Sequence, residues 1–142
     1  MELKIGKYVL DTDVETARTQ AAAAEIKVER NDEAHRRNFL EAVKALPAAV
    51  QEFLTPLGLD INHPYVISEN GKSEDGRHWY TAWYYMPGTI VEMGQEIAVT
   101  EECFCEFQKF CFRVPEDFPQ PRFQVNLDVC LPWVLEEENP KG

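Results

Sequence analysis

The most regular stretch of the chain is FQVNLDVCL, residues 123–131, in which apolar and polar positions alternate. Its apolar side chains are Phe123, Val125, Leu127, Val129 and Leu131. Successive side chains of a β-strand point to opposite faces of the sheet. The pattern therefore predicts a strand with one face in the core and the other face in water.

Other segments predict four more strands. Three lie after residue 63, at residues 64–69, 77–86 and about 97–114, and their turns are marked by glycine. Pro87-Gly88 is expected to end the strand at 77–86. At the start of the chain, apolar side chains on alternate positions predict a strand over residues 2–10.

Helical periodicity fills the region between the first strand and the later ones. The motif Thr12-x-x-Glu15 resembles a capping box, and it predicts a helix over residues 13–29 with a seam that is mostly alanine. A second helix is expected from residue 32 to 46, and a third from Pro47 to about Leu57, ended by Gly58. Such an alanine seam is more typical of close packing within a chain than of a coiled-coil dimer.

Helices grouped apart from strands are typical of an α+β domain. We expect the N-terminal strand and three helices to pack on one face of a mainly antiparallel sheet of about four to five strands. At 142 residues the chain has the size of a single domain, which we place at residues 1–135. The acidic tail at 136–142 is expected to be frayed.

Charge limits the classes of partner. The chain has 25 acidic and 14 basic residues, which gives a net charge of −11. An acidic surface repels phosphate groups, so we expect neither direct nucleic-acid binding nor membrane binding, and we expect a preference for basic partners. With no long apolar run and no signal peptide at the start, the composition predicts a cytoplasmic protein.

The sequence contains no recognisable catalytic or cofactor motif. Nucleotide-binding glycine loops, the nucleophile elbow and the H-E-x-x-H zinc motif are all missing, so we expect no cofactor and name no catalytic residue. The histidines His35, His63 and His78 belong to no recognisable triad. The cysteines are expected inside strands, as free thiols without a metal: Cys103, Cys105, Cys111 and Cys130.

The least ordinary segment is RHWYTAWYYM, residues 77–86. On a strand, Trp79, Trp83 and Tyr85 would share one face, while Tyr80, Tyr84 and Met86 would share the other. Aromatic side chains on both faces allow two interpretations. The segment is either a central core strand or a strand whose outer face recognises a partner.

These observations favour a non-catalytic protein-binding module that covers a basic partner surface. Small acidic inhibitors, such as immunity proteins and phage antagonists of bacterial defence, have this size and charge. The expected contacts are an aromatic face and an acidic rim, formed by Trp79, Trp83, Tyr84, Tyr85 and Trp133 and by Glu101, Glu102 and Glu106.

Two other functions remain open at this point. One is an enzyme or small-ligand binder with a pocket between sheet and helices, lined by Trp79, Trp83, Tyr85 and His78. The other is a structural or assembly subunit that forms a homo-oligomer through the alanine seam at 14–28 or through a sheet edge.

Overall fold

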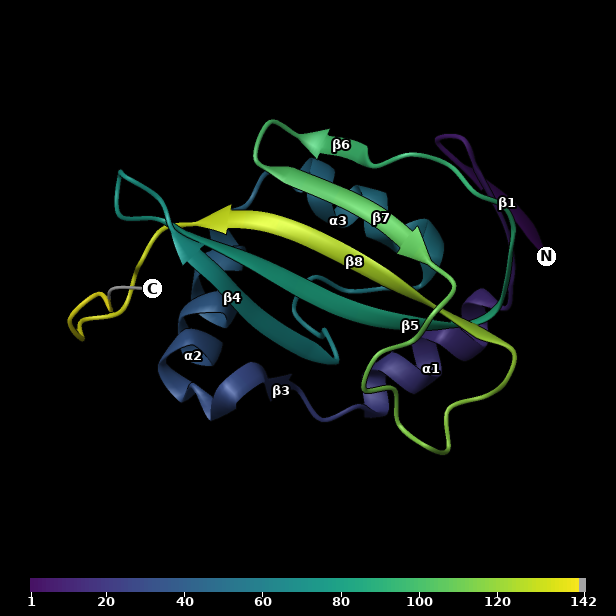
Figure 1. Cartoon of the computed structure of the whole chain (residues 1–142), viewed down its shortest axis with the longest axis horizontal. Helices are drawn as coiled ribbons and strands as arrows, with labels where there is room; N and C mark the ends of the chain where they lie inside the picture. The colour runs from purple at the N-terminus through teal and green to yellow at the C-terminus, as the bar shows by residue number, and fades with distance from the viewer. Residues whose placement is uncertain (141–142) are drawn as a thin grey trace.

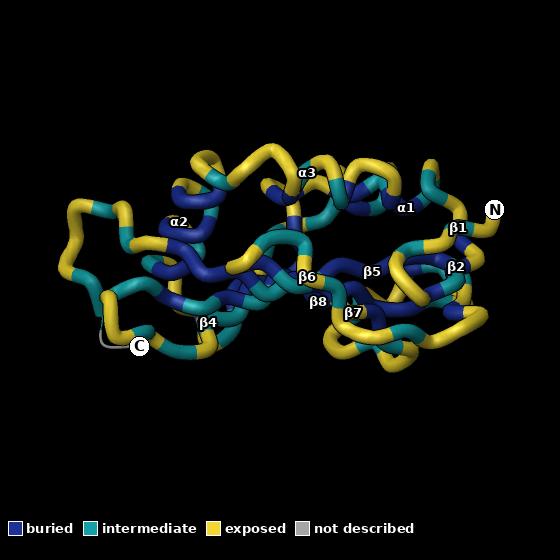
Figure 2. Tube along the Cα trace, turned by 90° about the horizontal axis from the view of Figure 1, so that it is seen from above, coloured by how far each residue is buried: buried dark blue, intermediate teal, exposed yellow. Residues whose placement is uncertain are grey.

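A computed structural model describes residues 1–140 and has two layers. Three helices cover one face of an eight-stranded, mainly antiparallel open sheet, and the other face carries no helix among the described residues (Figures 1 and 2). The α+β class is confirmed. None of the described helices is long and apolar enough to cross a membrane.

The sheet has six strands in its main order, β1-β2-β5-β8-β7-β6, with β4 beside β5 and β3 beside β4. Only the short β3–β4 pair is parallel. The strands are β1 Glu2–Ile5, β2 Tyr8–Thr12, β3 Lys27–Val28, β4 Val66–Lys72, β5 His78–Glu92, β6 Ile97–Thr100, β7 Cys103–Gln108 and β8 Arg122–Leu131.

The prediction of four to five strands is wrong because two predicted strands are hairpins and because residues 27–28, predicted as helix, form the short β3. The segment at 2–10 turns at Gly6, which adopts a positive φ of 58°, and so forms β1 and β2. The segment at 97–114 turns back after Thr100 to give β6 and β7, and residues 109–121 then form a loop. The N-terminal strand therefore belongs to the sheet itself.

Strand β5 joins the two ends of the sheet and does not stop at Pro87-Gly88. Its first part lies between β4 and β8, and after Pro87 it pairs with β2. Gly88 adopts a φ of 120°, and a Cβ atom there would lie 1.9 Å from the backbone oxygen of Asp11. A side chain is excluded at this crossing, so the glycine permits the strand to change partners instead of ending it.

The helices are shorter than predicted: α1 Val14–Ala23, α2 Glu33–Ala42 and α3 Ala48–Leu54. Asp13, and not Thr12, caps α1, because its carboxylate accepts from the backbone N–H of Thr16. The predicted helix at 13–29 ends at Ala23, and residues 27–28 pair with β4 instead. The buried Ala17 and Ala21 of the seam face the interior of the chain, where α1 contacts β5.

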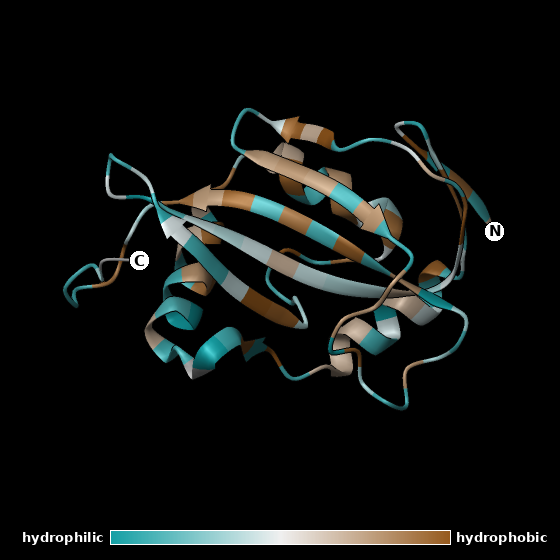
Figure 3. Cartoon of the chain, viewed as in Figure 1, coloured by the Kyte–Doolittle hydropathy of each residue, from teal (hydrophilic) through white to brown (hydrophobic). Residues whose placement is uncertain are grey.

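Strand β8 supplies the centre of the core. Its five alternate apolar side chains are all buried, as predicted, and the strand alternates visibly between hydrophobic and hydrophilic residues (Figure 3). The expectation that its other face is wet is wrong for Gln124, Asn126 and Cys130, which are buried as well. The loop at 109–121 and a polar network cover Gln124 and Asn126.

The C-terminal segment contacts the domain through several side chains. Glu137 forms an ion pair with Arg37 of α2, and the side chain of Asn139 bonds to His78 of β5 and to the backbone of Gly76. Residues 136–140 thus lie against one end of the molecule. The last two residues of the predicted frayed tail lie outside the described part of the chain.

Candidate functional site

The helix-free face of the sheet presents one row of side chains from each of three neighbouring strands. Thr81 of β5 lies beside Asp128 of β8, which lies beside Phe104 of β7. In the next row, Trp83 lies beside Asn126, which lies beside Glu106. Partners across a sheet point to the same face, so these side chains share the open face.

A hollow of about 340 Å³ lies on this face. Its aromatic rim consists of Trp83 and two loop residues, Phe110 and Phe112, whose side chains are 68% and 49% exposed. The rings of Trp83 and Phe112 meet edge to face with centroids 5.7 Å apart. The polar residues of the hollow are Thr81, Glu106, Gln108, Gln124, Asn126 and Asp128.

Amide side chains form the floor of the hollow and are linked to one another. Gln124 donates to Asn126 Oδ1, and Asn126 donates to Gln108 Oε1, both at 2.7 Å. The loop is tied to the same chain, because the backbone N–H of Phe112 donates to Gln124 Oε1 at 2.7 Å. These bonds fix the amides, and thereby place the aromatic rim over the sheet.

The hollow is acidic. Glu106 and Asp128 are both part of its lining, and none of the described residues that line it is basic. Asp128 accepts a hydrogen bond at 2.6 Å from Thr81, whose oxygen in turn accepts one from Asn70. A hydrogen-bonded carboxylate remains available to a cation on its other lone pairs.

The aromatic face that the sequence predicts is smaller in the structure. Trp79 and Trp83 lie on the open face and are partly exposed, and Trp79 stacks on Phe104. Tyr84 points under the helices and is fully buried. Tyr85 points to the open face, but the loop covers it through Phe118, and its hydroxyl bonds to the backbone oxygen of Phe112. Neither tyrosine can contact a partner.

The other predicted residues lie apart. Trp133 packs against His35 and His78 on the helical side of β5. Glu102, in the β6–β7 turn, pairs with Arg77, whereas Glu101 of the same turn is exposed. Of the predicted acidic rim, only Glu106 belongs to the hollow.

The predicted pocket between sheet and helices does not form from the residues assigned to it. Trp79 and Trp83 face away from the helices, whereas His78 lies on the helical side beside Trp133. The small-ligand alternative therefore has to use another cavity.

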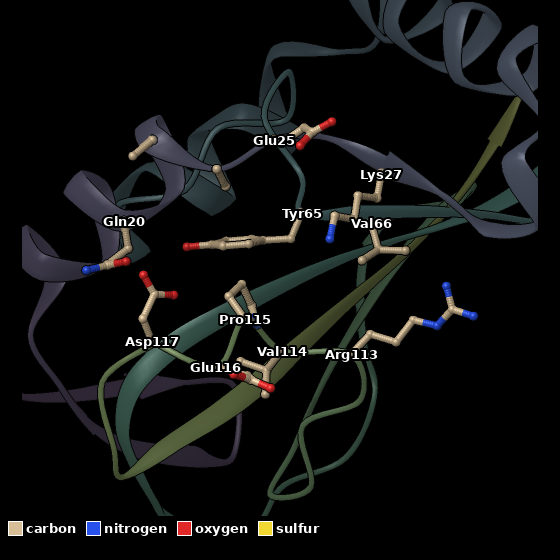
Figure 4. A pocket seen from close by; sticks show the side chains of 12 residues that line it. Gln20, Glu25, Lys27, Tyr65, Val66, Arg113, Val114, Pro115, Glu116 and Asp117 are labelled. Atoms are coloured by element: carbon tan, nitrogen blue, oxygen red, sulfur yellow. The ribbon is translucent and has the colours of Figure 1, made fainter.

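That other cavity, of about 470 Å³, lies between the end of α1 and the loop at 109–121 (Figure 4). Tyr65 lies in its middle, with its hydroxyl directed toward Gln20 and Asp117. The hydroxyl is buried without a hydrogen-bond partner among the described residues, and burial raises the pKa of this phenol. Water or a polar ligand could satisfy such a buried hydroxyl beside a cavity.

The cysteines are free thiols, but one lies outside the strands. Cys103 and Cys105 are buried, and desolvation raises the pKa of Cys103 to about 12. Cys111, which the sequence placed in a strand, is a half-buried loop residue. A thiol without a lowered pKa is a poor nucleophile at neutral pH, so these residues do not indicate redox catalysis.

A polar cluster lies under α2, on the opposite face from the hollow. It joins His35 of α2, Glu69 of β4 and His78 of β5, which each offer one nitrogen or oxygen within 4.8 Å of the others. Both imidazoles are buried. No pattern in the sequence indicates this cluster. His35 lies 34 positions before Glu69, and Glu69 lies nine before His78, and neither separation is a usual ligand spacing.

Of the residues that line the hollow, the sequence predicted only Trp83 and Glu106 as site residues. It missed Phe110, Phe112 and Asp128 and the polar residues Thr81, Gln108, Gln124 and Asn126. The polar residues of β8 were visible in the sequence. They could not be assigned to a site, because the residues that lie beside them depend on the strand register, which composition does not specify. Comparison with known proteins adds nothing to this geometry: no family model, no curated protein and no solved structure matches the chain.

Proposed function

We propose that this chain is a non-catalytic protein-binding module that receives a lysine or arginine side chain of a basic partner in the hollow on its open sheet face. The observation that carries the proposal is the composition of the hollow. Three aromatic rings and two carboxylates surround the same space, and the described lining contains no basic residue.

This combination is chemically suited to a cationic side chain. An ammonium or guanidinium group is attracted to the face of a tryptophan, and the interaction contributes up to about 2 kcal/mol when it is shielded from water. Glu106 and Asp128 supply charge-assisted acceptors, and the amides of the floor supply neutral ones. The alkyl stem of the partner's side chain would pack on Phe110 and Phe112.

The overall charge supports the same partner. A net charge of −11 attracts a basic surface over long distances, and the exposed carboxylates near the hollow accelerate the encounter. Aromatic side chains at the centre of an interface slow dissociation. An inhibitor that covers a basic surface needs both properties.

The test uses capture from the source cells, with the wild-type chain and two variants. Phe110→Ala removes an exposed ring from the rim, and Glu106→Gln with Asp128→Asn removes the two charges. We expect a partner that the wild type retains and both variants lose, with faster dissociation for the ring variant and slower association for the charge variant.

Each variant of the hollow has a control variant that makes a similar change outside the hollow. Met93→Ala removes another exposed apolar side chain, and Glu52→Gln neutralises an exposed acid on α3, on the other face of the sheet. Both should retain the partner. Equal retention by the hollow variants and by these controls would show that the hollow is not the binding site.

A second candidate function is the binding of a small polar ligand in the cavity beside Tyr65. The unpartnered hydroxyl of Tyr65 favours it, because a ligand acceptor or donor there would satisfy a buried group. Screening of small metabolites by thermal shift, with Tyr65→Phe as the comparison, tests it. A ligand that stabilises the wild type and Tyr65→Phe equally would count against this role.

A further inference from the structure

The cluster of His35, Glu69 and His78 has the layout of a metal centre. Three separate elements place one ligand atom of each residue within 4.8 Å of the other two. Both imidazoles are almost inaccessible to water, and the Glu69 side chain is 11% exposed. From this geometry we propose that the cluster binds one divalent transition-metal ion, with Zn²⁺ as the ion that its donors suit best.

The far side of each imidazole is already held in place. The hydroxyl of Tyr80 lies 2.8 Å from His35 Nδ1, and Asn139 Oδ1 lies 2.6 Å from His78 Nε2. Metal-binding histidines commonly bond through the second ring nitrogen to an outer partner that fixes ring orientation. The nitrogens that remain, His35 Nε2 and His78 Nδ1, face the carboxylates of Asp32 and Glu69, respectively.

Glu69 is positioned by an irregularity in β4. The strand register shifts between Glu69 and Gly71, and the backbone N–H of Gly71 donates to Glu69 Oε2. The same oxygen lies 2.8 Å from His78 Nδ1. Metal binding at His78 Nδ1 would replace the hydrogen bond to Glu69 and release its proton, and the carboxylate would then coordinate the ion.

Asp32, at the start of α2, lies next to His35 but outside the group of three ligand atoms, and its side chain would supply a fourth donor by moving toward the ion. Its Oδ1 caps the helix by accepting from the backbone N–H of His35, while its Oδ2 lies 3.8 Å from His35 Nε2. Two imidazoles and two carboxylates form a neutral site with a divalent cation. This set of nitrogen and oxygen donors suits zinc and cobalt better than magnesium or calcium, which prefer oxygen alone.

The separations between the donor atoms lie on both sides of those in an occupied site, and the three ligand atoms of the cluster are all within 4.8 Å of one another. Zinc bonds of about 2.0–2.2 Å place neighbouring ligands roughly 3.3 Å apart. The His78–Glu69 separation of 2.8 Å is shorter than this and the 3.8 Å between Asp32 and His35 is longer, so the side chains have to move apart or together to admit the ion.

An ion can reach the cluster from solvent. A small hollow of about 70 Å³ adjoins it and is lined by Asp32, His35 and Glu69 together with Glu29 and Arg30. Glu29 and Arg30 carry opposite charges at this opening, and their effects on an approaching cation cancel. The preference for a cation therefore comes from the ligand residues themselves. A water molecule in the hollow could complete the coordination of the ion.

The experiment titrates Zn²⁺ into the untagged, reduced and metal-stripped full chain by calorimetry, with a chelator competition to obtain the affinity. We expect one ion per chain. His35→Gln and Glu69→Gln should weaken binding by more than about 100-fold, and Asn139→Ala, which removes only an outer partner of His78, by about 10–100-fold. His63→Gln, an exposed loop histidine, and Cys111→Ser should leave the affinity unchanged.

Cobalt provides a readout that does not depend on variants. Co²⁺ bound by the cluster would show visible d–d bands without the near-ultraviolet charge-transfer band of a thiolate ligand, even if a histidine variant fails to fold. A thiolate band, unchanged affinity in Glu69→Gln and His35→Gln, or no Zn²⁺ uptake at 100-micromolar metal would overturn the proposal. In the last case the cluster serves only to join the C-terminal segment to β5.

Discussion

Leu127 and Asn126 are neighbours in β8 whose side chains enter different layers of the molecule. Leu127 is fully buried in the hydrophobic core, beside Ala82 of β5 and Cys105 of β7. Asn126 lies in the floor of the hollow and bonds to Gln108 and Gln124. The two residues therefore test the two faces of the same strand.

Replacing Leu127 by alanine should lower the free energy of unfolding by about 2–5 kcal/mol, because it leaves a cavity in a packed core. Asn126→Ala should cost about 1–2 kcal/mol, because it leaves the amides of Gln108 and Gln124 without their partner. Denaturant unfolding of both variants measures these values. A cost for Asn126→Ala equal to that of Leu127→Ala would mean that the polar floor is as important to stability as the core.

Asn126 also illustrates what the sequence could predict about the fold. Alternation in β8 predicts the core face correctly, because side-chain direction along a strand follows from geometry alone. It cannot predict that Gln124 and Asn126 are covered, since that depends on the β7 register and on the loop at 109–121. The hairpin at Gly6 was missed because the alternation of residues 1–9 continues through the turn.

The candidate site was predictable only in part. A strand with tryptophan on one face follows from the spacing of Trp79 and Trp83, and both do lie on the open face. Phe110 and Phe112 come from a loop whose path over the sheet is set by Phe118 and Tyr85, far from any local pattern. The pairing of His35 with Glu69 and His78 likewise requires the packing of α2 on the sheet.

Stability should depend on pH through His35. Burial lowers the pKa of this imidazole from its usual 6.5. The charges of Asp32 and Glu69 oppose this shift, and His78 adds a smaller lowering. The unfolded chain thus binds more protons than the folded chain just below pH 6.5. The stabilising contribution is present above that pH and is lost as the pH falls through the lower value of the folded state.

Unfolding of the wild type and of His35→Gln, each at pH 7.5 and pH 5.5 with a chelator present, measures this contribution. The wild type should lose more stability than the variant between these two values. A parallel loss in both proteins would assign the pH dependence to other groups.

In the native protein, one of the four thiols should react with an alkylating agent before the others. Cys103, Cys105 and Cys130 are buried, and Cys111 is the one that is partly exposed. Burial raises the pKa of Cys111, so alkylation at pH 8 should be slower than for a free cysteine but should reach this residue first. Mass spectrometry of the native protein should find one modified site, which Cys111→Ser removes.

After unfolding without a reductant, all four thiols should be titratable. A count of two would indicate a disulfide, and modification of Cys103 or Cys105 in the native protein would indicate that the β7–β8 region opens readily.

Plain DNA and RNA should not bind. The net charge of −11 repels a phosphate backbone, and many of the basic side chains are already paired with acids of the same chain. Arg37 pairs with Glu137, Arg77 with Asp75 and Glu102, and Arg113 with Glu29. These guanidinium groups are spread over α2, the β4–β5 turn and the loop at 109–121, so the ones described here form no stripe that could follow a backbone.

Fluorescence anisotropy with a labelled 20-mer, at low and at physiological salt, tests this directly. We expect no binding tighter than about 0.1 mM at physiological salt, the weak limit of non-specific association. An affinity that falls steeply with salt would contradict the prediction, because it would require a concentrated basic patch. If the partner that binds in the hollow is itself a nucleic-acid-binding protein, the chain should displace nucleic acid from that partner. The double variant Glu106→Gln with Asp128→Asn should displace it less well. Neither protein should bind the labelled 20-mer by itself.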